Sequence, residues 1–243
     1  MLVSFLGTGC SAPPPGRAQT CILLDDGRTR ILLDAGAGCY SRLVGRGLWL
    51  RDIDAVYISH LHVDHYGGLA DIVVDALIRG YRGSVDLLLP GGLEPGPVLG
   101  IMPGRGRELL HPVHLEPGRA ARVGTLTLQP LPARHSVEAY MVLVRGSDAS
   151  TVLYSGDTRP AYSAAAAIPR GSGLVIHEAT APTSMCREAA ETGHTCISEL
   201  AGVARAAAAP VAAVHLSAES LAELRLRRIK GLLVPGDDTD LHI

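Results

Sequence analysis

The sequence has almost no lysine, no asparagine and no long apolar run. Lys230 is the only lysine among 22 basic residues, which stand against 24 acidic residues and give a formal net charge of −2. A chain so close to neutral has no long-range attraction for nucleic acid, which leaves only a local basic patch open. Because no apolar stretch approaches the ~18 residues that a membrane helix needs, no membrane span is predicted.

The chain also lacks a basic leader and a disulfide framework. Residues 1–9 read MLVSFLGTG, in which a Gly-rich turn interrupts the apolar run, so they are predicted to form a first strand and not a signal peptide. The cysteine spacing shows neither CxxC pairs nor the pattern of a secreted scaffold. The five cysteines are Cys10, Cys21, Cys39, Cys186 and Cys196. An odd number in this arrangement predicts a reduced, cytoplasmic protein.

Length and apolar content favour a single α/β domain over residues 1–243, since 47% of the residues are hydrophobic. Leu69, Ile72, Val73, Ala76 and Leu77 have the spacing of one helix face. Strands are predicted at 2–6, 21–24, 30–34, 55–59, 85–90, 125–131, 139–144, 151–155, 173–177 and 211–216, and further helices at 196–208 and 220–230. Two sheets packed face to face with helices outside, a four-layer αββα sandwich, would satisfy this pattern.

Two local features carry finer predictions. Ser220 and Glu223 have the spacing of a capping box, and Gly231 is a plausible C-terminal stop for the helix that follows them. Residues 91–106 hold six glycines and three prolines, which predicts a long surface connection and leaves open a lid beside a site.

The most informative segment is residues 59–68, SHLHVDHYGG, which places four candidate metal ligands within six positions. On a strand, His60 and His62 would point to the same side, and a tight turn would then bring round Asp64 and His65. Imidazole and carboxylate groups suit Zn²⁺ and also Mn²⁺ or Fe²⁺. Four ligands so close together cannot bind one ion without strain, so two adjacent ions are expected to share them.

This HxHxDH segment resembles the motif of the metallo-β-lactamase-fold hydrolases. The resemblance implies three further ligands, and the chain offers each one after a predicted strand: His135, Asp157 and His215. It implies that His60, His62 and His135 hold one metal, that Asp64, His65 and His215 hold a second, and that Asp157 bridges the two. A hydroxide between two cations would then attack an electrophilic phosphorus or carbonyl, with Asp64 also orienting it.

Other segments resemble the ribonuclease Z (tRNase Z) group of this fold. They are FLGTGCSAP at 5–13 with Arg17, LDAG at 33–36, VIHEAT at 175–180 and GHT at 193–195. In that group a histidine assisted by a glutamate is thought to protonate the leaving alkoxide, and His194 with Glu178 would take these roles here. Asp34 would either cap a turn or support a metal ligand from behind.

The chain departs from ribonuclease Z where that group carries a long arm that grips tRNA. Between His135 and Asp157 there is room only for two strands and a turn, and Ala37 replaces the acidic residue that usually follows the family's DxG element. We therefore expect a dinuclear, zinc-dependent hydrolase of a small or cyclic phosphodiester, in a homodimer as is common in this group. The alternatives are a tRNA 3′-end nuclease, which would bind RNA, a glyoxalase II-like thioester or lactone hydrolase, and a non-catalytic partner subunit.

Overall fold

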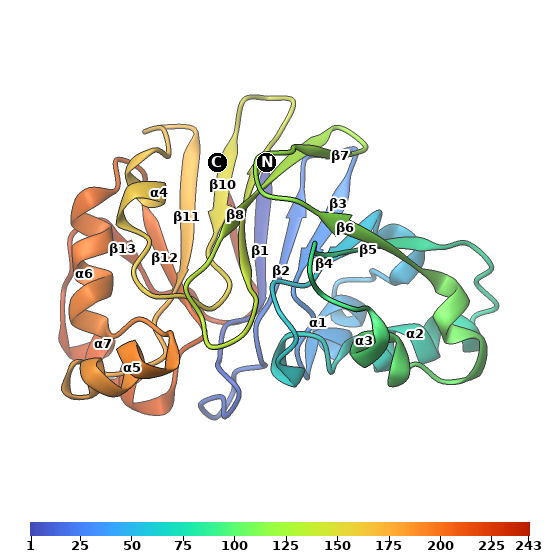
Figure 1. Ribbon diagram of the computed structural model, residues 1–243, viewed down its shortest axis with the longest axis horizontal. Helices are drawn as coiled ribbons and strands as arrows, with labels where there is room; N and C mark the ends of the chain where they lie inside the picture. The colour runs from blue at the N-terminus through green and yellow to red at the C-terminus, as the bar shows by residue number, and fades with distance from the viewer.

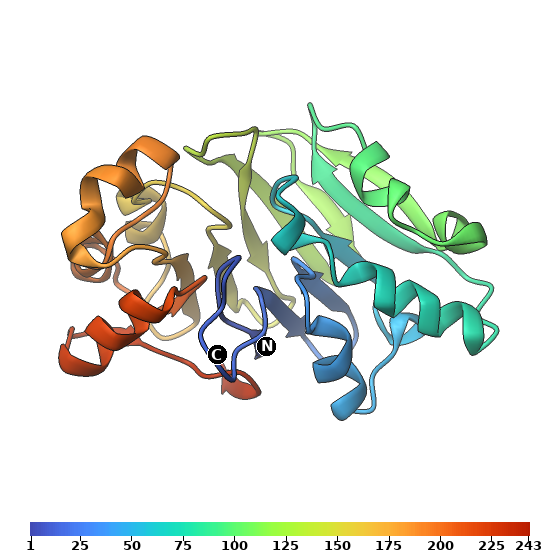
Figure 2. The same cartoon turned by 90° about the horizontal axis from the view of Figure 1, so that it is seen from below.

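The computed structural model describes residues 1–243 and has four layers (Figure 1). Two seven-stranded sheets face each other in the middle, and helices cover the outer side of each, as the view from below shows (Figure 2). One sheet has the order β14-β1-β2-β3-β4-β5-β6, and the other has the order β13-β12-β11-β10-β9-β8-β7. This is the αββα sandwich that the alternation of strands and helices predicted. None of the helices is both long and apolar enough to span a bilayer.

In the first sheet the pairs β14–β1, β1–β2 and β2–β3 are antiparallel, and the pairs β3–β4, β4–β5 and β5–β6 are parallel. Its strands are β1 (Leu2–Gly7), β2 (Cys21–Asp25), β3 (Arg30–Leu33), β4 (Ala55–Tyr57), β5 (Val85–Pro90), β6 (Leu110–Leu115) and β14 (Thr239–His242). The helices α1 (Cys39–Gly45), α2 (Leu69–Ile78) and α3 (Gly96–Gly100) belong to this half of the chain, with the 3₁₀ turns η1 (Leu50–Asp52), η2 (Val63–His65) and η3 (Gly104–Leu109).

In the second sheet β7 to β10 are antiparallel and β10 to β13 are parallel. Its strands are β7 (Ala121–Val123), β8 (Leu126–Pro132), β9 (Tyr140–Arg145), β10 (Thr151–Tyr154), β11 (Gly173–Glu178), β12 (Val211–Val214) and β13 (Leu232–Leu233). Its helices are α4 (Tyr162–Ala166), α5 (Cys186–Thr192), α6 (Ile197–Ala206) and α7 (Ala218–Leu226), with the 3₁₀ turn η4 (Thr183–Met185).

Alternation along the strands sorts the buried side chains into separate cores. On β1, Phe5 lies in the cluster between the two sheets, whereas its neighbour Leu6 lies in the cluster that faces the helices of the first half. On β10 the same division separates Tyr154, between the sheets, from Leu153, which faces the helices of the second half. Since successive side chains of a strand point to opposite faces, each sheet is buried on both sides.

The predicted capping box of the last helix is wrong. The helix predicted at 220–230 spans Ala218–Leu226 in the structure. Its N-cap is Ser217, whose hydroxyl accepts a hydrogen bond from Ser220 N at 3.1 Å. Glu223 binds Thr183 instead of closing a capping box. The Gly- and Pro-rich stretch 91–106 lies mostly at the surface, as predicted, but it also contains α3 and the start of η3, with Val98 and Met102 buried against the first core.

The expectation of five reduced cysteines is also wrong. Cys21 is bonded to Cys39 and Cys186 to Cys196, while Cys10 remains a free, buried thiol. The partners are 18 and 10 residues apart, so their spacing alone gave no signal of pairing. Backbone contacts made by the fold bring the first pair together, because the turn after β3 packs on the segment before β2 through Gly36 N and Thr20 O, 3.1 Å apart.

Candidate metal centre

The candidate ligands come from the two sheets, and most follow the end of a strand. The HxHxDH segment follows β4, His135 follows β8, Asp157 follows β10 and His215 directly follows β12. The structure brings them into two groups in which the ligand atoms lie within 4.8 Å of one another. One group holds His60, His62, His135 and Asp157, and the other holds Asp64, His65 and His215. The first group adds Asp157 to the three histidines that the resemblance implied for one metal, and the second consists of the three residues that it implied for the other. Asp157 also lies in a further group with His194 and His215.

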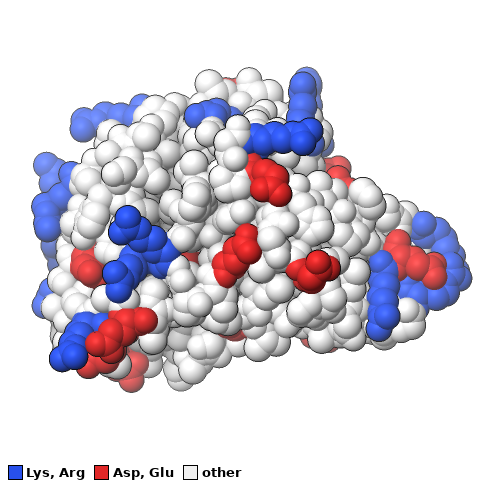
Figure 3. Space-filling model, in the orientation of Figure 1, with Lys and Arg blue, Asp and Glu red and all other residues white.

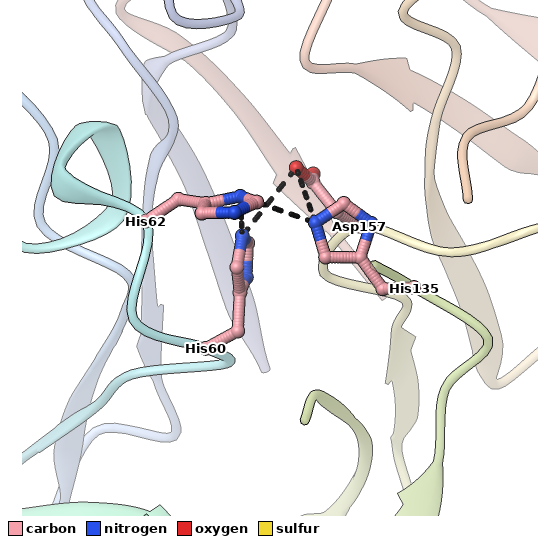
Figure 4. A group of neighbouring side chains, drawn as sticks. All are labelled: His60, His62, His135 and Asp157. Atoms are coloured by element: carbon pink, nitrogen blue, oxygen red, sulfur yellow. Dashed lines mark hydrogen bonds and ion pairs between the residues drawn. The ribbon is translucent and has the colours of Figure 1, made fainter. Parts of the chain in front are cut away.

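Three imidazoles of the first group point at one another beside Asp157 (Figure 4). His62 Nδ1 lies 2.9 Å from His60 Nε2 and 3.1 Å from His135 Nε2. The strand argument for this convergence is wrong, because β4 ends at Tyr57 and both His60 and His62 lie in the loop after it. A loop and not strand alternation aims them, with His62 in extended backbone just before η2.

Contacts behind the imidazoles fix which nitrogen faces the centre. His60 Nδ1 lies 3.0 Å from the Ser59 hydroxyl, and His135 Nδ1 lies 3.0 Å from Gly193 O. A backbone carbonyl can only accept, so His135 carries its hydrogen on Nδ1 and presents a lone pair at Nε2. Such outer partners orient metal-binding histidines in general.

Asp34 supports the second group from behind. Its Oδ2 accepts a hydrogen bond from His65 Nδ1 at 2.6 Å and another from the Tyr154 hydroxyl, and its Oδ1 accepts one from Ser59 N at 2.7 Å. Asp34 is completely buried and has a φ of 57°, a left-handed backbone that costs a non-glycine residue about 1–3 kcal/mol. His215 has a similar φ of 55°. Strain at these two positions indicates that the fold holds both side chains in place for the site.

The turns around the centre require glycine. A Cβ on Gly36 would lie 2.3 Å from Asp64 O, and a Cβ on Gly68 would lie 2.1 Å from Gly36 O. Both separations are too short for any side chain, so the LDAG turn and the glycine pair after His65 pack directly backbone to backbone. This contact packs the HxHxDH loop against the end of β3.

Electrostatics in the cluster match a cation site. Burial lowers the pKa of His60, and the neighbouring His65 lowers it further, so its pKa lies well below the ordinary value. Burial also lowers the pKa of His62 and of His135, which keeps these imidazoles neutral. Burial raises the pKa of Asp157, but the adjacent His215 and His65 outweigh burial and hold that pKa well below its ordinary value. The first ligand group therefore offers neutral imidazoles and an ionised carboxylate at neutral pH. In the second group burial lowers the pKa of His65, but the charges of Asp157 and Asp34 outweigh burial and hold that pKa well above its ordinary value.

Two buried polar atoms in the cluster have no hydrogen-bond partner. They are His65 Nε2 and Asp157 Oδ1. Buried polar atoms are almost always paired, and orphaned atoms cost free energy. Divalent cations would be suitable partners for these two atoms and for the imidazole lone pairs that converge at His62. Nitrogen and oxygen donors in this number suit Zn²⁺ and also Mn²⁺ or Fe²⁺.

His194 and Glu178 lie beside the ligands. His194 Nδ1 is 3.0 Å from Glu178 Oε1, and Glu178 is completely buried at the end of β11. Burial lowers the pKa of His194, but the hydrogen bond and the charge of Glu178 outweigh it and raise the pKa to about 9. His194 thus carries a proton next to the centre. It is also grouped with Asp157 and His215, so an additional ligand role is a distinct alternative.

Two residues of the segments that resemble ribonuclease Z make contacts that the sequence did not predict. The Arg17 guanidinium donates from Nη1 to the Thr8 hydroxyl and to Pro235 O, and so holds the N-terminal loop. Sequence reasoning gave Thr180 no role of its own, although it belongs to the quoted VIHEAT segment. Its hydroxyl lies 2.8 Å from both Glu178 Oε2 and His215 Nδ1. Only the fold reveals that contact.

Comparison with known proteins agrees with this architecture. Residues 1–94 match the family model described as "Anti-Pycsar protein Apyc1". The chain is 29% identical over 224 residues to "Ribonuclease Z, mitochondrial" of Drosophila melanogaster and 29% identical over 231 residues to "Zinc phosphodiesterase ELAC protein 2" of Rattus norvegicus. These matches cover 81% and 83% of this chain but only 28% of each relative, so the chain spans about a quarter of their length. A "Ribonuclease Z" of Mycobacterium sp. (strain KMS) is 28% identical over 232 residues, with coverage of 84% of this chain and 80% of the relative.

Solved structures share the whole fold. The metallo-β-lactamase-fold protein YhfI from Bacillus subtilis superposes with a TM-score of 0.80 at 17% identity and covers 99% of this chain and 98% of that chain. The short form of human tRNase Z gives a TM-score of 0.77 at 21% identity, with coverage of 100% and 99%. Fold and site together define a protein with the metallo-β-lactamase fold and a candidate divalent-metal centre. Within that fold the chain is ribonuclease Z-like.

Proposed function

We propose that the protein is a dinuclear metal-dependent phosphodiesterase that hydrolyses a small or cyclic phosphodiester. The observation that carries this proposal is the pair of ligand groups joined at Asp157, with the His194–Glu178 pair beside them. Two divalent ions held there, preferably zinc, would lower the pKa of a bound water to ~7 and neutralise charge on the phosphate. Relatives named ribonuclease Z and zinc phosphodiesterase support a phosphodiester substrate.

The protein's own residues would divide the work between orientation and proton transfer. Asp64 Oδ2 lies 3.2 Å from His215 Nε2, where it can hold the attacking water as well as a metal. With Nδ1 bound to Glu178, the His194 ring leaves Nε2–H to donate a proton to the leaving oxygen. Backbone N–H groups of Thr158 and Thr195 bond to Glu178 Oε1 at 3.1 and 3.2 Å and hold that carboxylate in place.

The size of the substrate is inferred from the rim of the site. Between His135 and Asp157 the chain forms only β9, β10 and their short connections, with no projecting arm. The loop after His135 is tied to the loop after β5 by Gly92 N and Glu138 Oε1, 3.1 Å apart. On the face shown in Figure 3, basic and acidic side chains are intermixed and no continuous basic surface is present. This surface is poorly suited to hold the body of a tRNA.

Processing of tRNA 3′ ends is the second candidate, favoured by the relatives named ribonuclease Z. A side-by-side assay of bis(p-nitrophenyl) phosphate, a cyclic nucleotide, a thioester and a precursor tRNA across a salt series separates the candidates. We expect hydrolysis of the small phosphodiesters with little salt dependence, and poor cleavage of the tRNA. Contacts to many phosphates would show as a steep loss of RNA cleavage with salt. Efficient, salt-sensitive cleavage of the tRNA would contradict the small-substrate proposal, and turnover of the thioester alone would contradict a phosphodiesterase.

We also propose that the protein forms a homodimer. The proposal rests on the group that the sequence resembles, in which dimers are common. Sedimentation equilibrium on the purified chain, whose mass is 25.4 kDa, tests the dimer directly. A single species at the mass of one chain at all concentrations would contradict it.

A further inference from the structure

The Thr180 hydroxyl lies between the proton-donor pair and a candidate metal ligand. Its Oγ1 is 2.8 Å from Glu178 Oε2, 2.8 Å from His215 Nδ1 and 3.3 Å from His194 Nδ1. Thr180 follows β11 by two residues, and its backbone N–H also bonds to Glu178 Oε2 at 3.0 Å. Thr180 therefore touches members of both functional groups without being a metal ligand itself.

The number of hydrogens fixes the direction of these bonds. A hydroxyl has one hydrogen, and the Glu178 carboxylate can only accept, so the hydrogen of Thr180 points to Glu178 Oε2. The Thr180 oxygen is then the acceptor for His215, whose hydrogen must lie on Nδ1. His215 Nε2 is then the nitrogen that faces Asp64 Oδ2, at 3.2 Å in the second ligand group. Because a carboxylate can only accept, Nε2 carries a hydrogen in this contact, and a metal ion bound there would replace that hydrogen.

His194 does not need the threonine in this arrangement. Its Nδ1 lies closer to Glu178 Oε1, at 3.0 Å, than to Thr180 Oγ1, at 3.3 Å. One buried carboxylate therefore serves two histidines through its two oxygens. Oε1 receives His194 directly, and Oε2 receives His215 through the hydroxyl of Thr180.

We propose that Thr180 is a positioning residue that connects Glu178 to His215 and sets the His215 tautomer for metal binding. The proposal rests on the dinuclear site of the proposed function and extends it. It predicts that the second metal site depends on a hydroxyl that makes no contact with the metal. Loss of such an outer partner typically weakens metal affinity by about 10–100-fold.

The test compares Thr180→Val and Thr180→Ser with a matched control, Thr183→Val. Thr183 donates its hydroxyl and its backbone N–H to one carboxylate, that of Glu223, at 2.5 and 2.7 Å, just as Thr180 does to Glu178. Glu223 belongs to neither ligand group. The metal-free variants are titrated with Zn²⁺ against a chelating dye, which needs no substrate.

We expect Thr180→Val to weaken the affinity for the second of two bound ions by about 10–100-fold and to leave the affinity for the first ion unchanged. Thr180→Ser and Thr183→Val should bind both ions like the wild type. At saturating zinc, kcat of Thr180→Val should return to within a few-fold of wild type, and its preference for good leaving groups should not change, because His194 keeps Glu178. Thr180→Ala, which also lacks the hydroxyl, should reproduce the metal defect if the valine variant folds poorly.

Wild-type affinity for both ions in Thr180→Val and Thr180→Ala would overturn the proposal, as would an equal loss in Thr183→Val. Failure of the proposed function would look different. A wild-type protein that binds two ions but hydrolyses no phosphodiester would refute the activity, and the zinc titration would still decide the role of Thr180.

Discussion

The two sheets contribute to the candidate metal centre in different ways. The first sheet supplies His60, His62, Asp64 and His65 from one short loop, which a single buried carboxylate, Asp34, supports from behind. The second sheet supplies its ligands one at a time from the ends of β8, β10 and β12, and adds the Glu178 network. The ligands of the first sheet thus come from one local motif, whereas the ligands of the second sheet are brought together only by the tertiary structure. The two parts meet at Asp157, whose Oδ2 lies 3.6 Å from His60 Nε2 and 3.3 Å from His65 Nε2.

Breaking the junction should have the largest effect. Asp157→Ala removes the carboxylate common to both parts, so we expect loss of bound metal and a fall in phosphodiester hydrolysis of more than about 10⁴-fold, since water without a lowered pKa is a poor nucleophile at neutral pH. Metal analysis and kinetics on the purified variant check this. Asp86→Ala is the control, because Asp86 pairs with an exposed histidine on β6, away from the site. Retention of both metals by Asp157→Ala would refute the bridging role.

Removing the proton donor His194 should slow the proton transfer that the second sheet supplies, without affecting metal binding. His194→Ala is expected to leave metal content unchanged and to slow hydrolysis by ~10²–10⁴-fold, the usual contribution of general acid catalysis. The loss should shrink for p-nitrophenyl esters, whose leaving group needs no proton. Equal losses for good and poor leaving groups would argue against the acid role, and loss of a metal would identify His194 as a ligand.

Weakening the support behind the first part should have a smaller effect. Asp34→Asn preserves the shape of the side chain but removes the charge that holds His65 Nδ1, so we expect metal affinity to fall by about 10–100-fold. Zinc titration of the variant measures this fall. Asp54→Asn is the matched control, because Asp54 also accepts a backbone N–H, that of Arg30 at 2.8 Å, but lies before β4, at the end remote from the ligands. Equal affinities in the two variants would show that Asp34 only ends a turn.

The smallest effect is expected at the end of β3 opposite Asp34. Burial raises the pKa of Asp26, but bonds from the Thr125 hydroxyl and the Thr29 N–H outweigh it and lower that pKa below its ordinary value. A lowered carboxyl pKa contributes stability above the unfolded pKa of ~4, and this stability is lost as the pH falls through the folded pKa. Asp26→Asn should therefore reduce Tm slightly at pH 7 and hardly at all near pH 2. An identical drop in Tm at both pH values would contradict this account.

The same contrast explains what the sequence could predict. The HxHxDH loop and the apolar face of α2 are local patterns, and the buried Leu69, Ile72, Val73 and Ala76 confirm the helix. The distant ligands were predicted only because their strand-end contexts resemble a known family. Strand alternation failed for His60 and His62 because β4 ends early, and spacing could not reveal the cysteine pairs or the contact between Thr180 and His215. Contacts between segments far apart in sequence depend on how the two sheets meet.

The measurement that tests the central claim most directly is the number of metal ions bound per chain. Elemental analysis of protein prepared with ample zinc should approach two ions for the wild type. For His215→Ala, which removes a ligand of the second group and none of the first, it should approach one, with activity lost. A stable value of one for the wild type, unchanged in His215→Ala, would contradict a dinuclear centre built jointly by the two sheets.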